Sequence, residues 1–173
     1  MKKRFLLLIL LSALLLSLNA SSEGCFSSLS FGINEGHTRG LDDSVAFRTS
    51  FIIDERLGAS FSLADHVTLS PFLLLRFVSK TVDAPPISFY MHMDIGAGLT
   101  LGVSANENLS LNATIYTGCG RYSSSSTCLA FIGAAAGLEY RMGSRFSIIP
   151  QLQFERSSYQ DSLSLLVGAG VRL

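Results

Sequence analysis

Charged side chains, and lysines above all, are scarce in this sequence. Asp, Glu, Lys and Arg make up only 15% of its 173 residues, whereas about a quarter or more of a soluble domain's surface is normally charged. Lys80 is the only lysine beyond Lys3, and the part of the chain that follows Arg4 has fewer basic than acidic residues. Nucleic-acid binding, which depends on basic surfaces, is therefore excluded as a main function.

Apolar runs long enough to form a membrane-spanning helix are missing beyond the first residues. Lys2, Lys3 and Arg4 precede an apolar run from Phe5 to Leu18, and Ala20 offers a small residue for cleavage. This order predicts a secretory signal peptide over residues 1–20, with residue 24 as an alternative end. Glycine or charged residues interrupt every later apolar run, and a spanning helix needs about 20 apolar residues. We therefore expect one exported domain, residues 25–173, without helical spans.

The most regular pattern in the chain is an alternation over residues 87–104. Every second residue is apolar, namely Ile87, Phe89, Met91, Met93, Ile95, Ala97, Leu99, Leu101 and Val103. The residues between them are polar residues or glycines. Because successive side chains of a strand point to opposite faces, this segment predicts a β-strand with one apolar face and one polar, glycine-rich face.

The same alternation returns along the chain and gives eight expected strands. They cover residues 28–35, 45–63, 67–78, 87–104, 109–116, 130–140, 146–155 and 163–173. Short turns near residues 65, 107 and 143 alternate with longer connections at 36–43, 80–86, 120–127 and 157–161. An even number of strands with short turns at one end and longer loops at the other is typical of transmembrane barrels. We therefore expect an all-β, eight-stranded antiparallel up-and-down transmembrane β-barrel.

The expected register keeps apolar positions opposite one another. Pairing Leu63 with Val67 sets Phe61 opposite Leu69, and pairing Cys119 with Cys128 sets Ile115 opposite Ile132. Both hairpins thereby gather their apolar side chains on one face, as cross-strand pairing requires.

The distribution of charge favours a membrane barrel over a soluble one. The charged or titratable residues expected to form a network in the lumen, on the polar face, are Arg56, Arg76, His92, Asp94, Glu139, Glu155 and Arg172. A soluble lipocalin-like barrel, the alternative, would place apolar side chains inside and charge outside. Mean hydropathy is +0.40, which also favours lipid. Glu55 is the one charged residue on the apolar face, and its distance from the turn predicts a position near the outer interface, where the cost is small.

This architecture resembles the small eight-stranded outer-membrane barrels, the class of the OmpA transmembrane domain, OmpX and OmpW. The resemblance spans the chain from about Cys25 to Leu173. It implies a monomer in the bacterial outer membrane, surrounded by lipid and inserted by the barrel-assembly machinery. Eight strands enclose little more than their own side chains, so a filled lumen is expected. A structural or surface-interaction role follows, with a channel for small solutes or hydrophobic compounds as the alternative.

One cluster on the polar face combines residue types used in nucleophilic catalysis. His92 shares that face with Ser88, Tyr90 and Asp94, and barrels that modify lipid A would need a histidine near a hydroxyl and a carboxylate. Same-face neighbours on a strand lie about 6 to 7 Å apart, however, and this cluster faces the lumen instead of lipid. The other two histidines lie in a loop and a turn, without metal-site spacing. We therefore expect no enzyme, no metal and no cofactor, with lipid A modification as the enzymatic alternative.

Two cysteines and the outer loops complete the candidate residues. Cys119 and Cys128 flank a serine-rich loop, and export permits a disulfide between them, with two free thiols as the alternative. Binding of a host or extracellular ligand would fall on the outer loops, because loops carry function on a rigid scaffold. The candidate contacts there are His37, Arg39, Asp42, Asp43, Arg121 and Tyr122. A purely structural role for the same surface stays open.

Overall fold

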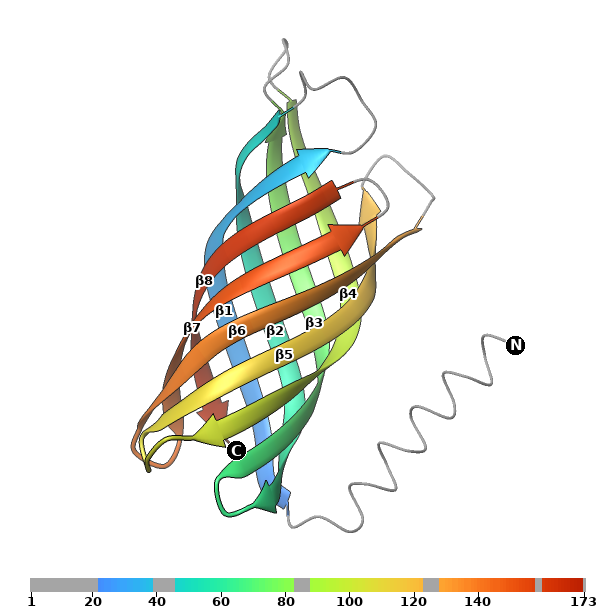
Figure 1. Ribbon diagram of the computed structural model, residues 1–173. Helices are drawn as coiled ribbons and strands as arrows, with labels where there is room; N and C mark the ends of the chain where they lie inside the picture. Colours follow the sequence, from blue (N-terminus) through green and yellow to red (C-terminus); the bar gives the residue numbers. More distant parts are fainter. Residues whose placement is uncertain (1–21, 39–45, 83–87, 123–127, 158–159, 173) are drawn as a thin grey trace, which may run out of the picture.

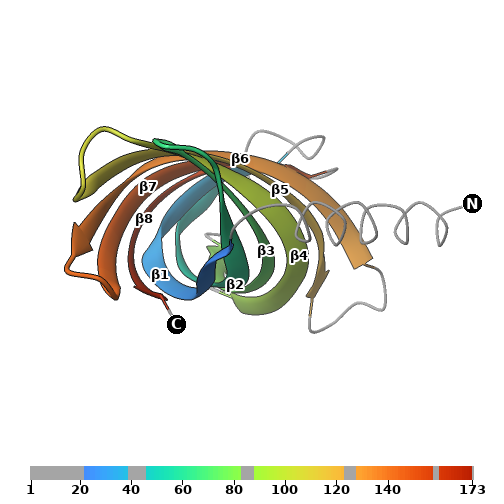
Figure 2. The same ribbon diagram turned by 90° about the horizontal axis from the view of Figure 1, so that it is seen from below.

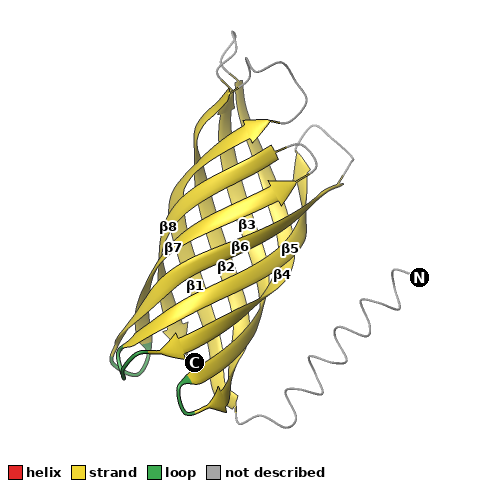
Figure 3. Cartoon of the chain, in the orientation of Figure 1, coloured by secondary structure: helices red, strands yellow, loops and turns green. Residues whose placement is uncertain are grey.

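The computed structural model describes residues 22–38, 46–82, 88–122, 128–157 and 160–172, and these form strands joined by tight turns (Figures 1 and 3). The strands are β1 (Ser22–Thr38), β2 (Ala46–Ala64), β3 (Val67–Val82), β4 (Ser88–Ser104), β5 (Leu109–Tyr122), β6 (Cys128–Met142), β7 (Phe146–Ser157) and β8 (Gln160–Arg172). The proposed signal peptide lies outside the described residues. Within them, no helix has the length and apolar character needed to cross a membrane.

The strands close into a single barrel. Each pairs antiparallel with its neighbours in sequence, and β1 also pairs with β8 (Figure 2). Following the paired residues from Phe26 once around the barrel leads back to β1 at Gly36, an offset of ten residues. Eight strands with this stagger are strongly tilted and enclose a narrow interior. The predicted eight-stranded, up-and-down barrel is confirmed.

Side chains alternate between the outside of the barrel and its lumen, as the sequence pattern predicts. On β4, the outward-facing Ile95 is 59% exposed, whereas the adjacent residue Asp94, which faces the lumen, is 2% exposed. The outward side chains form an apolar surface that we call the outer belt. It includes Phe31, Ile33, Phe51, Leu57, Leu73, Ile95, Leu111, Ile115, Ile132, Leu152, Phe154, Leu163, Leu165 and Val167. A surface of this kind fits lipid acyl chains, whereas the lumen holds the polar residues and a smaller buried apolar set that includes Ile52, Leu74 and Leu166.

Local chemistry explains the tight turns. The Asn106 Oδ1 atom accepts hydrogen bonds from the backbone N–H groups of Asn108 and Leu109, at 2.9 Å each, and so closes the turn between β4 and β5. Gly143, between β6 and β7, has a φ of 74°, which a residue without Cβ adopts at little cost. All three turns lie at the barrel end where β8 finishes (Figure 1).

Two details of the register differ from expectation. Phe61 faces Leu69 as predicted, but Ala64 rather than Leu63 faces Val67, because the pairing is irregular between Ser62 and Ala64. In the β5–β6 hairpin Ile132 faces Thr117 instead of Ile115, a shift of two residues. A shift of two leaves every side chain on its predicted face, so the alternation alone does not reveal it.

Strand lengths and the height of Glu55 also differ from expectation. β1 begins at Ser22 and continues to Thr38, and only residues 158–159 separate β7 from β8. Glu55 pairs with Leu29 and Leu75 on the outer belt, between the outward aromatic positions of Phe51 and Phe61 on the same strand. It therefore lies in the middle of the outer belt, not near its outer edge.

Candidate functional site

Arg76 occupies the centre of the lumen, where it projects from β3. Its side chain is only 2% exposed. The guanidinium donates from Nε to Asp54 Oδ1 at 2.6 Å and from Nη2 to Asp54 Oδ2 at 3.3 Å, a two-pronged contact with one carboxylate. Nη2 also donates to Gln153 Oε1 at 3.1 Å, and Nη1 donates to Glu155 Oε2. Arg76 therefore joins β2, β3 and β7 across the interior.

Further groups complete this cluster and satisfy its polar atoms. Gln153 Nε2 donates to Asp54 Oδ2 at 2.9 Å, and the Tyr116 hydroxyl donates to Gln153 Oε1 at 3.3 Å. The rings of Tyr116 and Phe131 lie 5.2 and 5.6 Å from the Arg76 Cζ atom, within the range of cation–π contact. We call Asp54, Arg76, Tyr116, Gln153 and Glu155 the central cluster.

Glycines on the lumen face make room for the aromatic rings around the central cluster. A Cβ atom on Gly133 would overlap the Tyr116 ring, and one on Gly98 would overlap the Phe72 ring. The alternation therefore places glycine where a large side chain from the adjacent strand crosses the lumen. The glycine-rich face recognised in the sequence is the packing surface of the barrel interior.

Two small cavities lie on either side of the central cluster. The outer cavity, about 30 Å³, is lined by residues that include Asn34, His92, Asp94 and Glu155. His92 Nε2 lies 3.3 Å from Asp94 Oδ1, and Asp94 Oδ2 lies 3.9 Å from Arg76 Nη1. The inner cavity, about 70 Å³, lies toward the turns. The central cluster stands between the two cavities.

The residues expected to form one lumen network fall into two groups. Arg76, His92, Asp94 and Glu155 come together around the cluster, and Arg56 Nη2 lies 3.5 Å from Asp54 Oδ2. The remaining pair lies apart, at the end of the barrel that carries the turns. There Arg172 Nη2 donates to Glu139 Oε1 at 3.2 Å, and Arg141 Nε lies 3.8 Å from the same oxygen.

Sequence reasoning missed three members of the central cluster. Asp54, Tyr116 and Gln153 all occupy the polar face, which the alternation identifies correctly, but no local motif distinguishes them from their neighbours. The sequence signal that could have identified Asp54 was its cross-strand position, because Asp54 lies directly opposite Arg76 in the β2–β3 register. Opposite charges at paired lumen positions are a recognisable cue once a hairpin is assigned.

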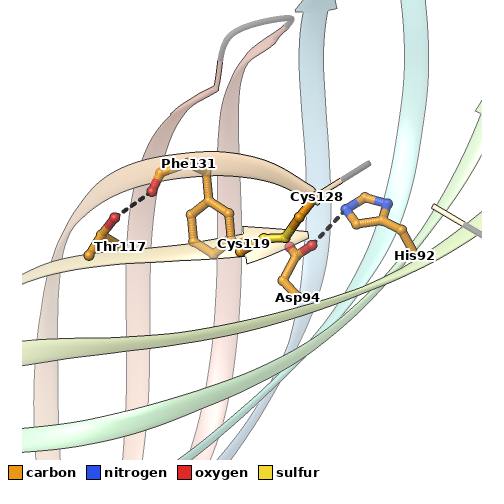
Figure 4. Close-up of a disulfide and its surroundings, with 6 residues drawn as sticks. All are labelled: His92, Asp94, Thr117, Cys119, Cys128 and Phe131. Atoms are coloured by element: carbon orange, nitrogen blue, oxygen red, sulfur yellow. Dashed lines mark hydrogen bonds and ion pairs between the residues drawn. A yellow bond between two sulfur atoms is a disulfide. The ribbon is translucent and has the colours of Figure 1, made fainter. Parts of the chain in front are cut away.

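At the outer end of the barrel a disulfide joins Cys119 to Cys128, whose Cα atoms lie 5.7 Å apart (Figure 4). Close to it, the Thr117 hydroxyl donates to the Phe131 carbonyl at 2.7 Å. The two sulfurs come from the outward faces of β5 and β6, at diagonal positions of the register. The bridge thus ties the two strands together where the 123–127 connection leaves them.

The expected loop contacts are only partly located. His37, Arg121 and Tyr122 belong to the ends of β1 and β5 instead of to loops, because these strands run further than the alternation indicated. Arg39, Asp42 and Asp43 lie outside the described residues, as do the side chains of the other three.

The groups in the outer cavity do not form a recognisable catalytic or metal centre. His92 and Asp94 approach each other, but the side chains of Ser88 and Tyr90 lie outside the described residues. Among the residues that the structure describes, no three His, Cys, Asp or Glu side chains are placed to hold a metal ion. The described side chains neutralise one another's buried charges. Among them, no hydroxyl or thiol is placed beside His92 to act as a nucleophile.

Comparison with known proteins gives structural matches only. No protein-family model and no curated protein sequence matches the chain. The crystal structure of Neisserial surface protein A (NspA) matches with a TM-score of 0.61 and 10% identity, over 88% of this chain and 99% of that one. Ail, the attachment invasion locus protein of Yersinia pestis, in complex with the heparin analogue sucrose octasulfate, matches with a TM-score of 0.57 and 16% identity, over 87% and 99%.

An outer-membrane enzyme shares the same fold. PagL matches with a TM-score of 0.57 and 10% identity, over 83% of this chain and 97% of that one. The fold therefore does not exclude catalysis, and the absence of enzymatic activity stays a prediction for this chain. The expected outer-membrane location agrees with the outer belt and with the proteins that share the fold. The chain is an eight-stranded barrel of the small outer-membrane type, which confirms the resemblance recognised in its sequence.

Proposed function

We propose that this protein is a monomeric, non-conducting outer-membrane barrel that presents its outer connections at the cell surface. The observation that carries the proposal is the central cluster, which fills the lumen between the two cavities. Arg76 is held by Asp54, Gln153 and Glu155 from two separate parts of the sheet. An ion crossing the lumen would have to displace these contacts, and breaking a buried ion pair costs about 3 to 5 kcal/mol.

Planar-bilayer recording of the refolded full chain tests the closed lumen. We expect no stable conductance above the bilayer background, and Arg76→Ala should introduce channel openings because it removes the side chain that joins β3 to β7. Arg145→Ala, in a turn outside the lumen, is the matched control and should stay silent. A large, stable conductance of the unmodified protein would favour the alternative of a small-solute channel.

The second part of the proposal is a binding role at the outer end. Its support is the disulfide, which cross-links β5 and β6 on either side of the 123–127 connection and so fixes the separation of the two strand ends that carry it. NspA is named as a surface protein, and the Ail structure contains a heparin analogue. We therefore propose an extracellular ligand, for which heparin is a suitable first probe.

Whole-cell binding separates this role from a purely structural one. Cells displaying the unmodified barrel are compared with cells displaying a barrel whose residues 39–45 and 123–127 are replaced by Gly-Ser segments of equal length. Heat-dependent gel migration verifies that both barrels fold. We expect the replaced barrel to retain less than a tenth of the heparin bound by the unmodified one. Equal binding, or none by either, would leave the structural role as the better account.

A further inference from the structure

We propose that the inner cavity is a binding site for a small inorganic anion, centred on the Arg56 guanidinium. Arg56 projects from β2 into the lumen with its side chain 9% exposed. Its Nε and Nη2 atoms are buried and have no hydrogen-bond partner among the described residues, and the ion pair from Nη2 to Asp54 Oδ2 is long, at 3.5 Å. Five N–H groups on a planar fork suit an oxyanion or a halide, and a buried donor left without an acceptor is costly.

The nearest carboxylate, Asp54, compensates the charge of Arg56 only in part. Asp54 lies 3.5 Å from Arg56 Nη2, but both of its oxygens already accept closer hydrogen bonds from Arg76 and Gln153. The Arg56 Cζ atom lies 5.1 Å from the centroid of the Phe72 ring, which holds the guanidinium in place without offering a lone pair. The cation is therefore positioned by its neighbours while its N–H groups keep their capacity to donate.

The walls of the inner cavity supply further donors. Hydroxyl groups predominate among the polar lining residues, which are Ser28, Ser60, Ser70, Thr100, Asn112, Thr114, Ser147 and Gln151. Ser60 is bonded to Ser70 and Thr100 to Thr114, each at 2.9 Å, and Gln151 Nε2 donates to Ser30 Oγ at 3.4 Å. Each hydroxyl pair still leaves one hydroxyl hydrogen that can donate to an anion. A volume of about 70 Å³ has room for chloride or phosphate or for a few waters, and it excludes a sugar polymer or a lipid headgroup with its chains.

The charges that line the inner cavity also favour an anion. Besides Arg56 they are Arg172 and Glu139, and Glu139 is already paired with Arg172 at 3.2 Å and with Arg141 at 3.8 Å. The lining of the outer cavity has the opposite balance, with Asp94 and Glu155 beside Arg76. Arg172 lies at the end of β8 with its side chain 26% exposed, so an anion would enter from the side of the turns.

Isothermal titration calorimetry of the refolded full chain in detergent micelles tests the site. The background salt is sodium gluconate, whose organic anion is much larger than either probe, and the probes are sodium phosphate and sodium chloride in separate titrations. We expect saturable binding of one anion per chain for at least one probe. Arg56→Gln should weaken that binding at least tenfold, and Arg145→Gln, an exposed turn arginine, should leave it within twofold of the unmodified protein.

Two further variants keep the test decisive if Arg56→Gln fails to fold. Arg56→Lys retains the charge but loses the planar fork, and Ser147→Leu reduces the space without touching Arg56. Both should weaken binding, and retained heat-dependent migration verifies their folding. Absence of saturable binding for both probes, or binding unaffected by all folded cavity variants, would overturn the proposal and assign the Arg56 N–H groups to water. Neither result bears on conductance, so the proposed closed lumen is tested independently.

Discussion

Replacing Arg76 with methionine should be one of the most destabilising single substitutions available in the lumen. Methionine keeps much of the side-chain length but removes the cation that Asp54 and Glu155 share, and both carboxylates stay in place. Removing one partner of a buried ion pair costs about 3 to 5 kcal/mol. Arg76 is 2% exposed and donates to three residues, so we expect Arg76→Met to lie within that range, well above the ~1 kcal/mol of an exposed pair.

The measurement is urea unfolding of the refolded protein in phospholipid vesicles. The chain contains no tryptophan, so far-ultraviolet circular dichroism, which follows the strands, replaces fluorescence as the probe. Heat-dependent gel migration supplies a second probe of barrel closure. The free energy of unfolding is obtained by linear extrapolation, with agreement between the two probes as the test of two-state behaviour.

A compensated variant separates charge from shape. Adding Asp54→Asn and Glu155→Gln to Arg76→Met removes the uncompensated carboxylates, and we expect it to recover more than half of the lost free energy of unfolding. The reasoning is refuted if Arg76→Met lies within ~1 kcal/mol of the unmodified protein. It is equally refuted if the triple variant is no more stable than the single one, because the loss would then come from packing.

Three other variants test the outer belt, the lumen packing and the disulfide by the same unfolding assay. Glu55→Leu should raise the free energy of unfolding by about 1 to 2 kcal/mol, since a carboxylate in the middle of the outer belt is costly; no gain would indicate that Glu55 is shielded from lipid. Gly133→Ala should lower it by about 1 to 3 kcal/mol because the new methyl group overlaps the Tyr116 ring, and an unchanged value would contradict that packing. Cys119→Ala with Cys128→Ala should lower it by about 2 to 3 kcal/mol, and equal stability of the reduced unmodified protein and the variant is the internal check.

The two faces of each strand were predictable because they depend only on a period of two, and the strand number and closure followed from the turns and connections between the alternating segments. The alternation with neighbouring residues shows that Ile95 faces outward and Asp94 faces the lumen. A register error of two residues, as in the β5–β6 hairpin, does not change which face a side chain occupies. This is why the barrel and its polar lumen follow from the sequence while the pairing of Ile132 does not.

The partners that reach Arg76 from β7 could not be predicted, because they depend on the offset of the closed barrel. The ten-residue stagger brings Gln153 and Glu155 across from β2 and β3, and no local pattern encodes that stagger. Glu155 was among the seven residues expected to form the lumen network. Asp54 and Gln153 were not, although both accept hydrogen bonds from Arg76 as Glu155 does. The height of Glu55 was misjudged for the same reason, since strand tilt fixes how far a residue rises above its turn.

The central cluster also bears on how the barrel assembles. Asp54 and Arg76 belong to one early hairpin, whereas Gln153 and Glu155 arrive on β7, and a sheet in which β1 has not yet met β8 keeps the two sets apart. An unclosed intermediate would therefore hold Glu155 without its counterion Arg76, whereas Arg76 already has Asp54 on its own hairpin. Closure of the barrel removes that penalty in one step, so we expect the last stage of assembly to be all-or-none. Partly closed barrels with exposed strand edges should then be short-lived in the membrane.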